Sequence, residues 1–174
     1  MPAAAKVSRP VRIAVLTVSD TRGPADDRSG DTLVERLTTA GHILADRGIV
    51  RDDAELIVSR LHAWIDDPAV EVIVTTGGTG VTGRDVTPEA VSQVSDKLIP
   101  GFGELFRWQS HAKIGTSTIQ SRACAGVARG TYIFALPGST GAVKDGWDGI
   151  LASQLDIDHK PCNFVELMPR LEER

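Results

Sequence analysis

The chain has 174 residues, and its 19 Lys and Arg against 23 Asp and Glu give a formal net charge of −4 at pH 7. This length suits one domain with its own core, and an acidic balance without a Lys/Arg block argues against binding to nucleic acid or anionic membranes. The two cysteines are isolated and the four histidines lack paired spacing, which argues against a disulfide framework and a zinc site. The sequence shows no signal segment and no apolar run of ~20 residues, so we expect a soluble, cytoplasmic protein.

Short apolar segments alternate with segments of helical period, a pattern typical of βαβ units in a mainly parallel sheet. Residues 1–10 are predicted to be a disordered lead-in. Residues 12–18 predict a strand buried on both faces, because their apolar run has no polar break before Thr17. A helix from about residue 30 to residue 40 should follow, and then a weaker strand over 42–50. We expect that strand near the sheet edge.

The middle of the chain predicts a helix, a strand and two further helices. Asp52 or Asp53 can cap a helix whose apolar residues follow the helical period, and residues 70–75 predict a central strand. After a loop, Thr87 is a candidate N-cap with Pro88 at the first helical position. Residues 101–113 predict the next helix.

A hairpin and a last helix complete the predicted elements. Residues 126–128 and 131–136 are joined by Arg129-Gly130, and a two-residue turn can join only antiparallel strands, so the sheet should be mixed. Apolar residues from Val143 to Leu151 give the last helix its buried stripe.

The sharpest motif follows the third strand: Thr75-Thr76-Gly77-Gly78-Thr79-Gly80, with Asp85 close behind. Ligands of open α/β sheets lie outside the carboxyl ends of the strands. Closely spaced glycines let backbone N–H groups turn toward an anion, and a carboxylate beside that anion suggests a bridging divalent cation. The string therefore predicts a metal-nucleotide site.

Other interpretations of these residues remain open. The glycines could form only a turn, or they could be a dinucleotide-binding fingerprint, although that fingerprint should open the first βαβ unit. The absence of a Walker A lysine argues against a P-loop ATPase, and the absence of a G-x-S-x-G elbow argues against a serine hydrolase. Asp20 could be a turn residue and Asp52 only a helix cap. Asp26, Asp27 and Asp31 most simply solvate a mobile loop and start a helix.

Five segments in order resemble the MoaB/Mog family of molybdenum cofactor biosynthesis, and most closely its MoaB branch. They are residues 15–20, 75–90, 100–104, 115–122 and 137–139. The combination of Thr-Thr-Gly-Gly-Thr-Gly with Arg-Asp-Val-Thr-Pro is the most specific of them.

The resemblance implies a three-layer α/β/α sandwich over residues 11–165, with a tail over 166–174, that binds molybdopterin. It implies transfer of an adenylyl group from Mg-ATP to the terminal phosphate of molybdopterin, with release of pyrophosphate, ahead of molybdate insertion. It also implies a homotrimer or a hexamer built as a dimer of trimers, with a downstream molybdenum-insertion protein as a possible partner.

The family pattern assigns catalytic and Mg²⁺-holding roles to Asp52 and Asp85. Contacts with the pterin, the nucleotide or their phosphates are expected from Ser19, Asp20, Thr76, Gly77, Gly78, Thr79, Gly80, Ser121, Arg122, Pro137, Gly138 and Ser139. The alternative is a non-catalytic molybdopterin-binding or assembly protein, because some MoaB-branch proteins lack the aspartate-bearing signature. This chain keeps that signature at residues 84–88, which favours the enzyme.

Overall fold

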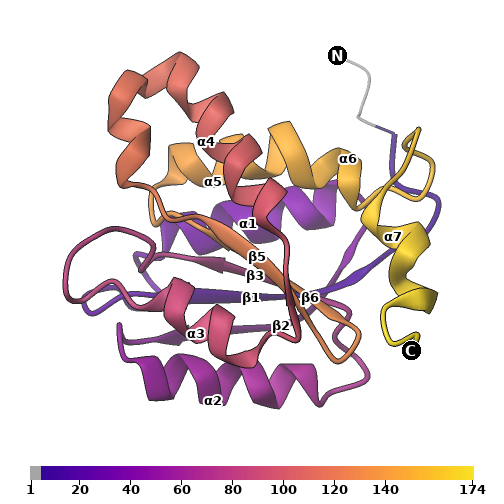
Figure 1. Ribbon diagram of the computed structural model, residues 1–174, viewed down its shortest axis with the longest axis horizontal. Coiled ribbons are helices and arrows are strands. Elements are labelled where there is room, and N and C mark those ends of the chain that lie inside the picture. Colours follow the sequence, from indigo (N-terminus) through magenta and orange to yellow (C-terminus); the bar gives the residue numbers. More distant parts are fainter. Residues whose placement is uncertain (1–4) are drawn as a thin grey trace.

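A six-stranded sheet with the order β2-β1-β3-β6-β5-β4 runs through the computed structural model, which describes residues 5–174 (Figure 1). The strands are β1 (Arg12–Val18), β2 (Ile43–Val50), β3 (Val72–Thr76), β4 (Lys97–Leu98), β5 (Cys124–Ala128) and β6 (Thr131–Leu136). The first four in spatial order are parallel, whereas β5 pairs antiparallel with β6 and with β4. The predicted mixed sheet with one hairpin is confirmed, and β2 lies at an edge as expected.

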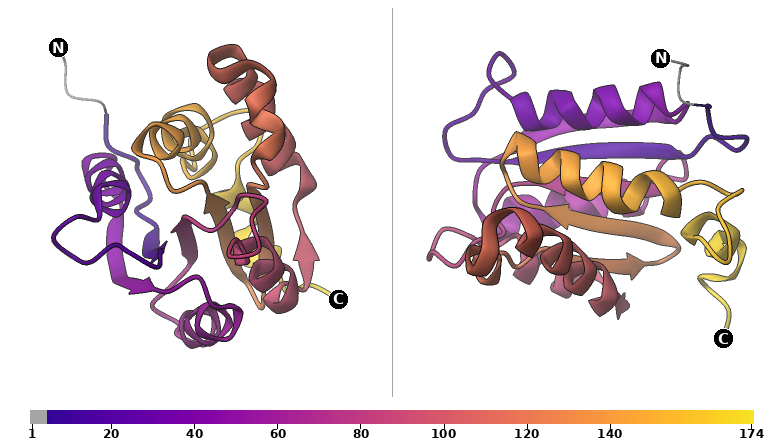
Figure 2. Two further views of the ribbon diagram at one scale, coloured as in Figure 1. Left: turned by 90° about the vertical axis from the view of Figure 1, so that its left-hand side faces the viewer. Right: turned by 90° about the horizontal axis from the view of Figure 1, so that it is seen from above.

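Helices cover both faces of the sheet and make three layers (Figure 2). One face carries α1 (Arg28–Thr39), α4 (Pro100–Ile114) and α5 (Thr140–Gly146), and the other α2 (Ala54–Ile65) and α3 (Thr87–Val94). A 3-10 helix, η1 (Gly115–Gln120), follows α4, while a π-helical turn (Trp147–Leu151) and α6 (Ala152–Gln154) continue α5. The α/β/α prediction is confirmed. Among residues 5–174, no helix combines the length and apolar character that a membrane span requires.

Strand β1 lies between two hydrophobic clusters, which explains its unbroken apolar sequence. Ile13 and Val15 belong to the cluster under α1, α4 and α5, while Ala14 and Leu16 belong to the cluster under α2 and α3. Successive side chains of a strand point to opposite faces, so a strand covered on both sides must be apolar at every position. Each fully buried Ile, Leu or Val contributes about 1.5–3 kcal/mol.

Two helix starts, those of α1 and α3, differ from the predictions, and for α2 the structure decides between the two predicted caps. Helix α1 begins at Arg28, earlier than expected, because the Asp27 carboxylate accepts a hydrogen bond from the Gly30 amide (3.1 Å) and caps it. The cap of α2 is Asp53, so the adjacent Asp52 is not the cap. Thr87 is the first residue of α3 and not its N-cap, because its hydroxyl donates across the loop instead.

Both ends of the described chain contact the domain. Part of the predicted lead-in over residues 1–10 lies outside the described residues, and within the rest the Val7 amide donates to the Ala40 carbonyl (2.9 Å). Near the other end, α7 (Phe164–Leu167) and a 3-10 turn (Met168–Arg170) place Val165 in the core, with Leu171 packed against the same cluster. The segment predicted as a tail after residue 165 therefore supplies core contacts.

Candidate functional site

A cavity of about 910 Å³ opens at the carboxyl ends of the four parallel strands. Its lining includes Val18 and Ser19 at the end of β1, Asp52 after β2, residues 77–80 after β3 and residues 137–139 after β6. The chain runs from β1 outward to β2 and then returns past β1 to β3, so β1 and β3 flank the point where the strand order reverses. Ligands of doubly wound sheets bind at this point.

Most of the predicted site residues meet in this cavity. Those that line it are Asp52, Asp85, Ser19, Gly77, Gly78, Thr79, Gly80, Ser121, Pro137, Gly138 and Ser139. Three others, Asp20, Thr76 and Arg122, lie outside its lining. Thr76 is fully buried, and its hydroxyl donates to the Pro137 carbonyl (3.0 Å), so it joins the loops after β3 and β6.

The glycine loop, residues 77–80, has its carbonyl groups bound to the scaffold behind it. Its first and second carbonyls accept hydrogen bonds from the hydroxyl and the amide of Thr87 (2.9 and 3.0 Å). Its third and fourth carbonyls accept from the amide and the Nε of Arg122 (2.8 and 2.7 Å). With every carbonyl engaged, the orientation of the loop's peptide groups is fixed.

Two amides of the glycine loop differ from its carbonyls, because they have no acceptor within the described part of the chain. Gly77 and Gly78 have φ angles of 102° and 69°, a left-handed backbone that side chains other than glycine rarely adopt. Among residues 5–174, the amides of Gly78 and Thr79 donate to no protein acceptor. Buried or cavity-lining N–H groups without a protein partner are the donors that anion-binding nests use. The loop is therefore suited to a phosphate.

Arg122 holds this loop from behind. Besides the loop carbonyls, its guanidinium donates to the Asp85 carbonyl (2.9 Å) and pairs with Glu89. These contacts raise the pKa of Arg122, chiefly through the Glu89 hydrogen bond. Arg122 was predicted to contact pterin or phosphate, but its donors bind protein groups instead. Its role in the structure is to join the glycine loop to α3.

Asp20 is also committed to another side chain. Its carboxylate forms a two-point ion pair with Arg84 (2.8 and 2.9 Å) and accepts a hydrogen bond from the Asp52 amide (3.2 Å). The Arg84 hydrogen bond is the largest cause of a lowered pKa of Asp20. Asp20 thereby fixes the backbone that carries Asp52, while its own carboxylate lies outside the cavity lining.

Asp52 and Asp85 are the two predicted catalytic carboxylates, and both line the cavity. Burial raises the pKa of Asp52, and the nearby charges of Asp20 and Asp85 raise it further. Burial also raises the pKa of Asp85, but hydrogen bonds from the hydroxyl and amide of Thr82 (2.8 and 2.9 Å), together with the Gly80 amide and the charge of Arg122, outweigh it, so the pKa lies below its ordinary value. Two carboxylates that repel each other beside an anion site favour a cation between them.

The donor set fits Mg²⁺ bound together with a phosphate. Among residues 5–174, no group of three or more His, Cys, Asp and Glu side chains is arranged to hold a metal ion alone. Mg²⁺ usually takes one or two carboxylates and completes its coordination with water and substrate phosphates. Asp52 and Asp85 would supply the carboxylates, and the glycine loop would hold the phosphate.

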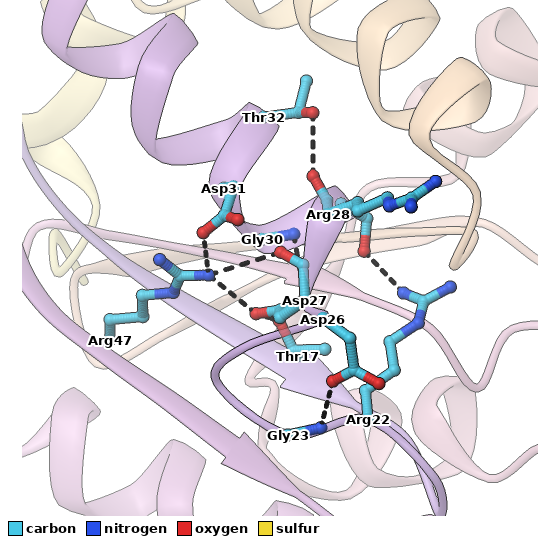
Figure 3. Close-up of polar contacts among 11 residues, drawn as sticks. Thr17, Arg22, Gly23, Asp26, Asp27, Arg28, Gly30, Asp31, Thr32 and Arg47 are labelled. Atoms are coloured by element: carbon cyan, nitrogen blue, oxygen red, sulfur yellow. Dashed lines mark hydrogen bonds and ion pairs between the residues drawn. The ribbon is translucent and has the colours of Figure 1, made fainter.

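The buried Asp27 corrects the interpretation of the acidic residues after β1. Asp27 is fully buried and accepts hydrogen bonds from the Thr17 hydroxyl (2.7 Å) and from Arg47 Nη2 (2.9 Å) (Figure 3). The same Nη2 donates to Asp31 (2.7 Å). Asp27 was expected to solvate a mobile loop and to start a helix; it does cap α1, but its side chain is buried and joins this loop to β1, α1 and β2.

Three basic side chains of the cavity were missed from the sequence. Arg22, Lys113 and Lys144 come from the loop after β1, the end of α4 and α5, and all three line the cavity. Lys113 forms an ion pair with Asp145. No spacing rule pointed to them, because they lie on three separate elements.

Comparison with known proteins agrees with this geometry. Residues 14–156 match a family model described as "Probable molybdopterin binding domain". Over 155 residues, the chain is 50% identical to molybdenum cofactor biosynthesis protein B of Escherichia coli strain K12, covering 89% of this chain and 91% of that protein. The chain belongs to the MoaB/Mog family of molybdenum cofactor biosynthesis.

Solved structures place the fold in the same family. A crystal structure of molybdenum cofactor biosynthesis protein B superposes with a TM-score of 0.86 at 39% identity, covering 97% of this chain and 100% of that one. The tungsten cofactor synthesizing protein MoaB from Pyrococcus furiosus gives a TM-score of 0.75 at 38% identity, with 83% and 92% covered. The predicted membership of the MoaB/Mog family is confirmed.

Proposed function

We propose that the protein binds molybdopterin and transfers an adenylyl group from Mg-ATP to its terminal phosphate, releasing pyrophosphate ahead of molybdate insertion. One observation carries the proposal: the glycine loop, two of whose amides have no acceptor among residues 5–174, lines the same cavity as the carboxylates of Asp52 and Asp85. At about 910 Å³, that cavity is at the large end of the range for small-molecule sites, as two substrates together would require.

The chemistry needs little covalent help from the protein. The pterin phosphate attacks the α-phosphorus of ATP, a P–O bond forms, and pyrophosphate leaves. Such transfers depend on alignment and on neutralising the charge of the phosphoryl oxygens. Bound Mg²⁺ would supply charge neutralisation at the reacting phosphate oxygens.

The chain's own groups would share the remaining tasks. The amides of Gly78 and Thr79 would donate to phosphate oxygens in fixed directions, since the carbonyls of their loop are bound to Thr87 and Arg122. Asp52 and Asp85 would hold the cation, with Asp85 kept ionised by its hydrogen bonds from Thr82.

The test is an oxygen-free turnover experiment. Mg-ATP and molybdopterin should yield adenylylated pterin and pyrophosphate with the wild-type protein. Asp85→Asn should abolish product, because it removes the charge that holds the cation, while pterin binding stays largely intact. The matched control is Asp66→Asn. Asp66 is an exposed carboxylate at the C-terminal end of α2, whereas Asp52 lies just before the start of that helix. Stoichiometric pterin binding without product would favour the alternative, a non-catalytic molybdopterin-binding or assembly protein.

We also propose that the protein forms a homotrimer or hexamer and delivers its product to a molybdenum-insertion protein. Large apolar side chains exposed on α4 and η1 support the oligomer, because exposed apolar surface often marks an interface. Trp108 is 75% exposed and Ile119 is 77% exposed. Light scattering coupled to size-exclusion chromatography measures the mass, and a monomer at micromolar concentration would contradict the proposal.

A further inference from the structure

The loop that follows β1 carries an arginine into the cavity. Arg22 lines the cavity together with the glycine loop, and its side chain is held at two points. Nη1 donates to the Ser29 hydroxyl (2.7 Å) and Nη2 donates to the Gly138 carbonyl (2.7 Å). These contacts connect the start of α1 with the loop after β6, so the guanidinium is fixed at the cavity wall.

The positive charge of Arg22 has no ion-pair partner within the described part of the chain. Both of its acceptors are uncharged, and among residues 5–174 no carboxylate forms an ion pair with it. Arg47 on the neighbouring strand β2 differs from Arg22, because it forms ion pairs with both Asp27 and Asp31. A guanidinium has more N–H donors than two acceptors use, and its planar fork matches phosphate oxygens. Arg22 therefore offers both free donors and uncompensated charge to the cavity.

Arg22 is connected to the glycine loop through Gly138, whereas the two carboxylates lie directly beside its later residues. Gly138, to which Arg22 donates, packs against Gly77: an added Cβ on Gly138 would lie 3.3 Å from the Gly77 Cα. A Cβ on Gly78 would lie 3.0 Å from the Asp52 carboxylate, and one on Gly80 would lie 2.6 Å from the Asp85 carboxylate. The cationic group is therefore held next to the neighbour of the loop's first residue, and the anionic groups lie beside its second and fourth residues.

We propose that Arg22 binds a phosphate group of a substrate directly, beside the first residue of the glycine loop. The proposal rests on the proposed function, in which two anionic groups must approach each other. A cation held by Asp52 and Asp85 would neutralise one phosphate at the later residues of the loop. Arg22 neutralises the other without needing the cation. The buried Asp27 positions it indirectly, because Asp27 caps the helix that presents Ser29.

The test measures phosphate binding without metal. Isothermal titration calorimetry of the whole protein in EDTA, with inorganic phosphate and then pyrophosphate, removes the contribution of the carboxylate-held cation. Arg22→Gln should bind pyrophosphate about 10- to 100-fold more weakly, the loss expected for charge-assisted hydrogen bonds. Arg28→Gln is the matched control, an exposed arginine in the first turn of α1 that does not line the cavity, and should bind as the wild type does.

Two substrates could provide the phosphate, and the same experiment separates them. Titration with ATP and with molybdopterin, still in EDTA, should show the Arg22→Gln loss for only one, which identifies the source. Arg22→Lys keeps the charge without the planar fork and should bind several-fold more weakly at an unchanged melting temperature. This variant tests the contact if Arg22→Gln fails to fold.

Three results would overturn the proposal: wild-type protein that binds no pyrophosphate in EDTA, Arg22→Gln that binds it as tightly as the Arg28→Gln control, or a folded Arg22→Lys with wild-type affinity. Failure of the proposed function gives a different pattern. Phosphate binding would still depend on Arg22, but no adenylylated pterin would form with Mg-ATP.

Discussion

Replacing Asp27 with asparagine removes a negative charge from a fully buried position while keeping the size of the side chain. Asparagine can still accept the hydrogen bond from the Gly30 amide, so the cap of α1 survives. What is lost is the charge that faces the Thr17 hydroxyl and Arg47 at 2.7 and 2.9 Å.

The size of the effect follows from how well Arg47 is compensated. Removing one partner of a buried ion pair costs about 3–5 kcal/mol. Arg47 keeps Asp31 as a partner at 2.7 Å and its side chain is 29% exposed, so water and Asp31 recover part of this. We expect Asp27→Asn to lower the free energy of unfolding by about 2–3 kcal/mol. For a chain of this length, that corresponds to a fall in melting temperature of about 5–10 °C.

The matched control changes the other partner of the same arginine. The Asp31 side chain is 61% exposed, and exposed ion pairs contribute only about 0–1 kcal/mol. Thermal and urea unfolding of Asp27→Asn, Asp31→Asn and wild type would measure the difference. Equal stability of the two variants would refute the argument, because it would show that burial of Asp27 adds nothing to its pairing.

Two further predictions test the cavity and the core. Gly78→Ala should leave a folded protein whose phosphate binding, measured by calorimetry, is at least about tenfold weaker. The reason is that alanine is strained at φ 69° and that its Cβ would press on Thr87 and lie 3.0 Å from the Asp52 carboxylate. An unchanged affinity for phosphate would contradict the role of the loop. Burial lowers the pKa of His42 below 6.5, so the unfolded chain takes up a proton that the folded protein does not, and stability should fall as pH drops below about 6.5. In His42→Gln the new side chain can still accept a hydrogen bond from the Val11 amide, which His42 accepts at 3.1 Å. The variant should therefore lose less stability than the wild type between pH 7.5 and pH 5.5, as measured by melting temperatures. An equally large fall in the melting temperature of the variant would show that another group causes the pH dependence.

The alternation of elements could be predicted because it follows from local rules. The unbroken apolar run of β1 requires cover on both faces of the sheet. The Arg129-Gly130 turn has φ angles of 45° and 83°, which a two-residue hairpin needs, so the antiparallel pair was predictable. The glycine string marked a loop with left-handed residues after β3, and it lies in the cavity. The short strand β4, with two exposed residues, carries no such pattern and was missed.

The roles of individual polar residues depended on contacts with distant parts of the chain. Asp52 and Asp53 are adjacent and equally suited to cap a helix, and only the folded chain shows that Asp53 caps α2 while Asp52 lines the cavity. Arg122 lies in a family motif yet binds the back of the glycine loop, whereas Arg22, outside any motif, faces the cavity.

The physical reason is the range over which each preference acts. Hydrophobic period, turn chemistry and left-handed glycines are settled within a few residues, so the amino-acid sequence by itself determined the alternation of strands and helices, the hairpin and the position of the glycine loop. Whether a charged side chain is buried, paired or left facing a cavity depends on partners such as Arg47 for Asp27, 20 positions away, or Gly138 for Arg22, 116 positions away. Only the tertiary structure brings those partners together, and it alone decided which charges are available to a ligand.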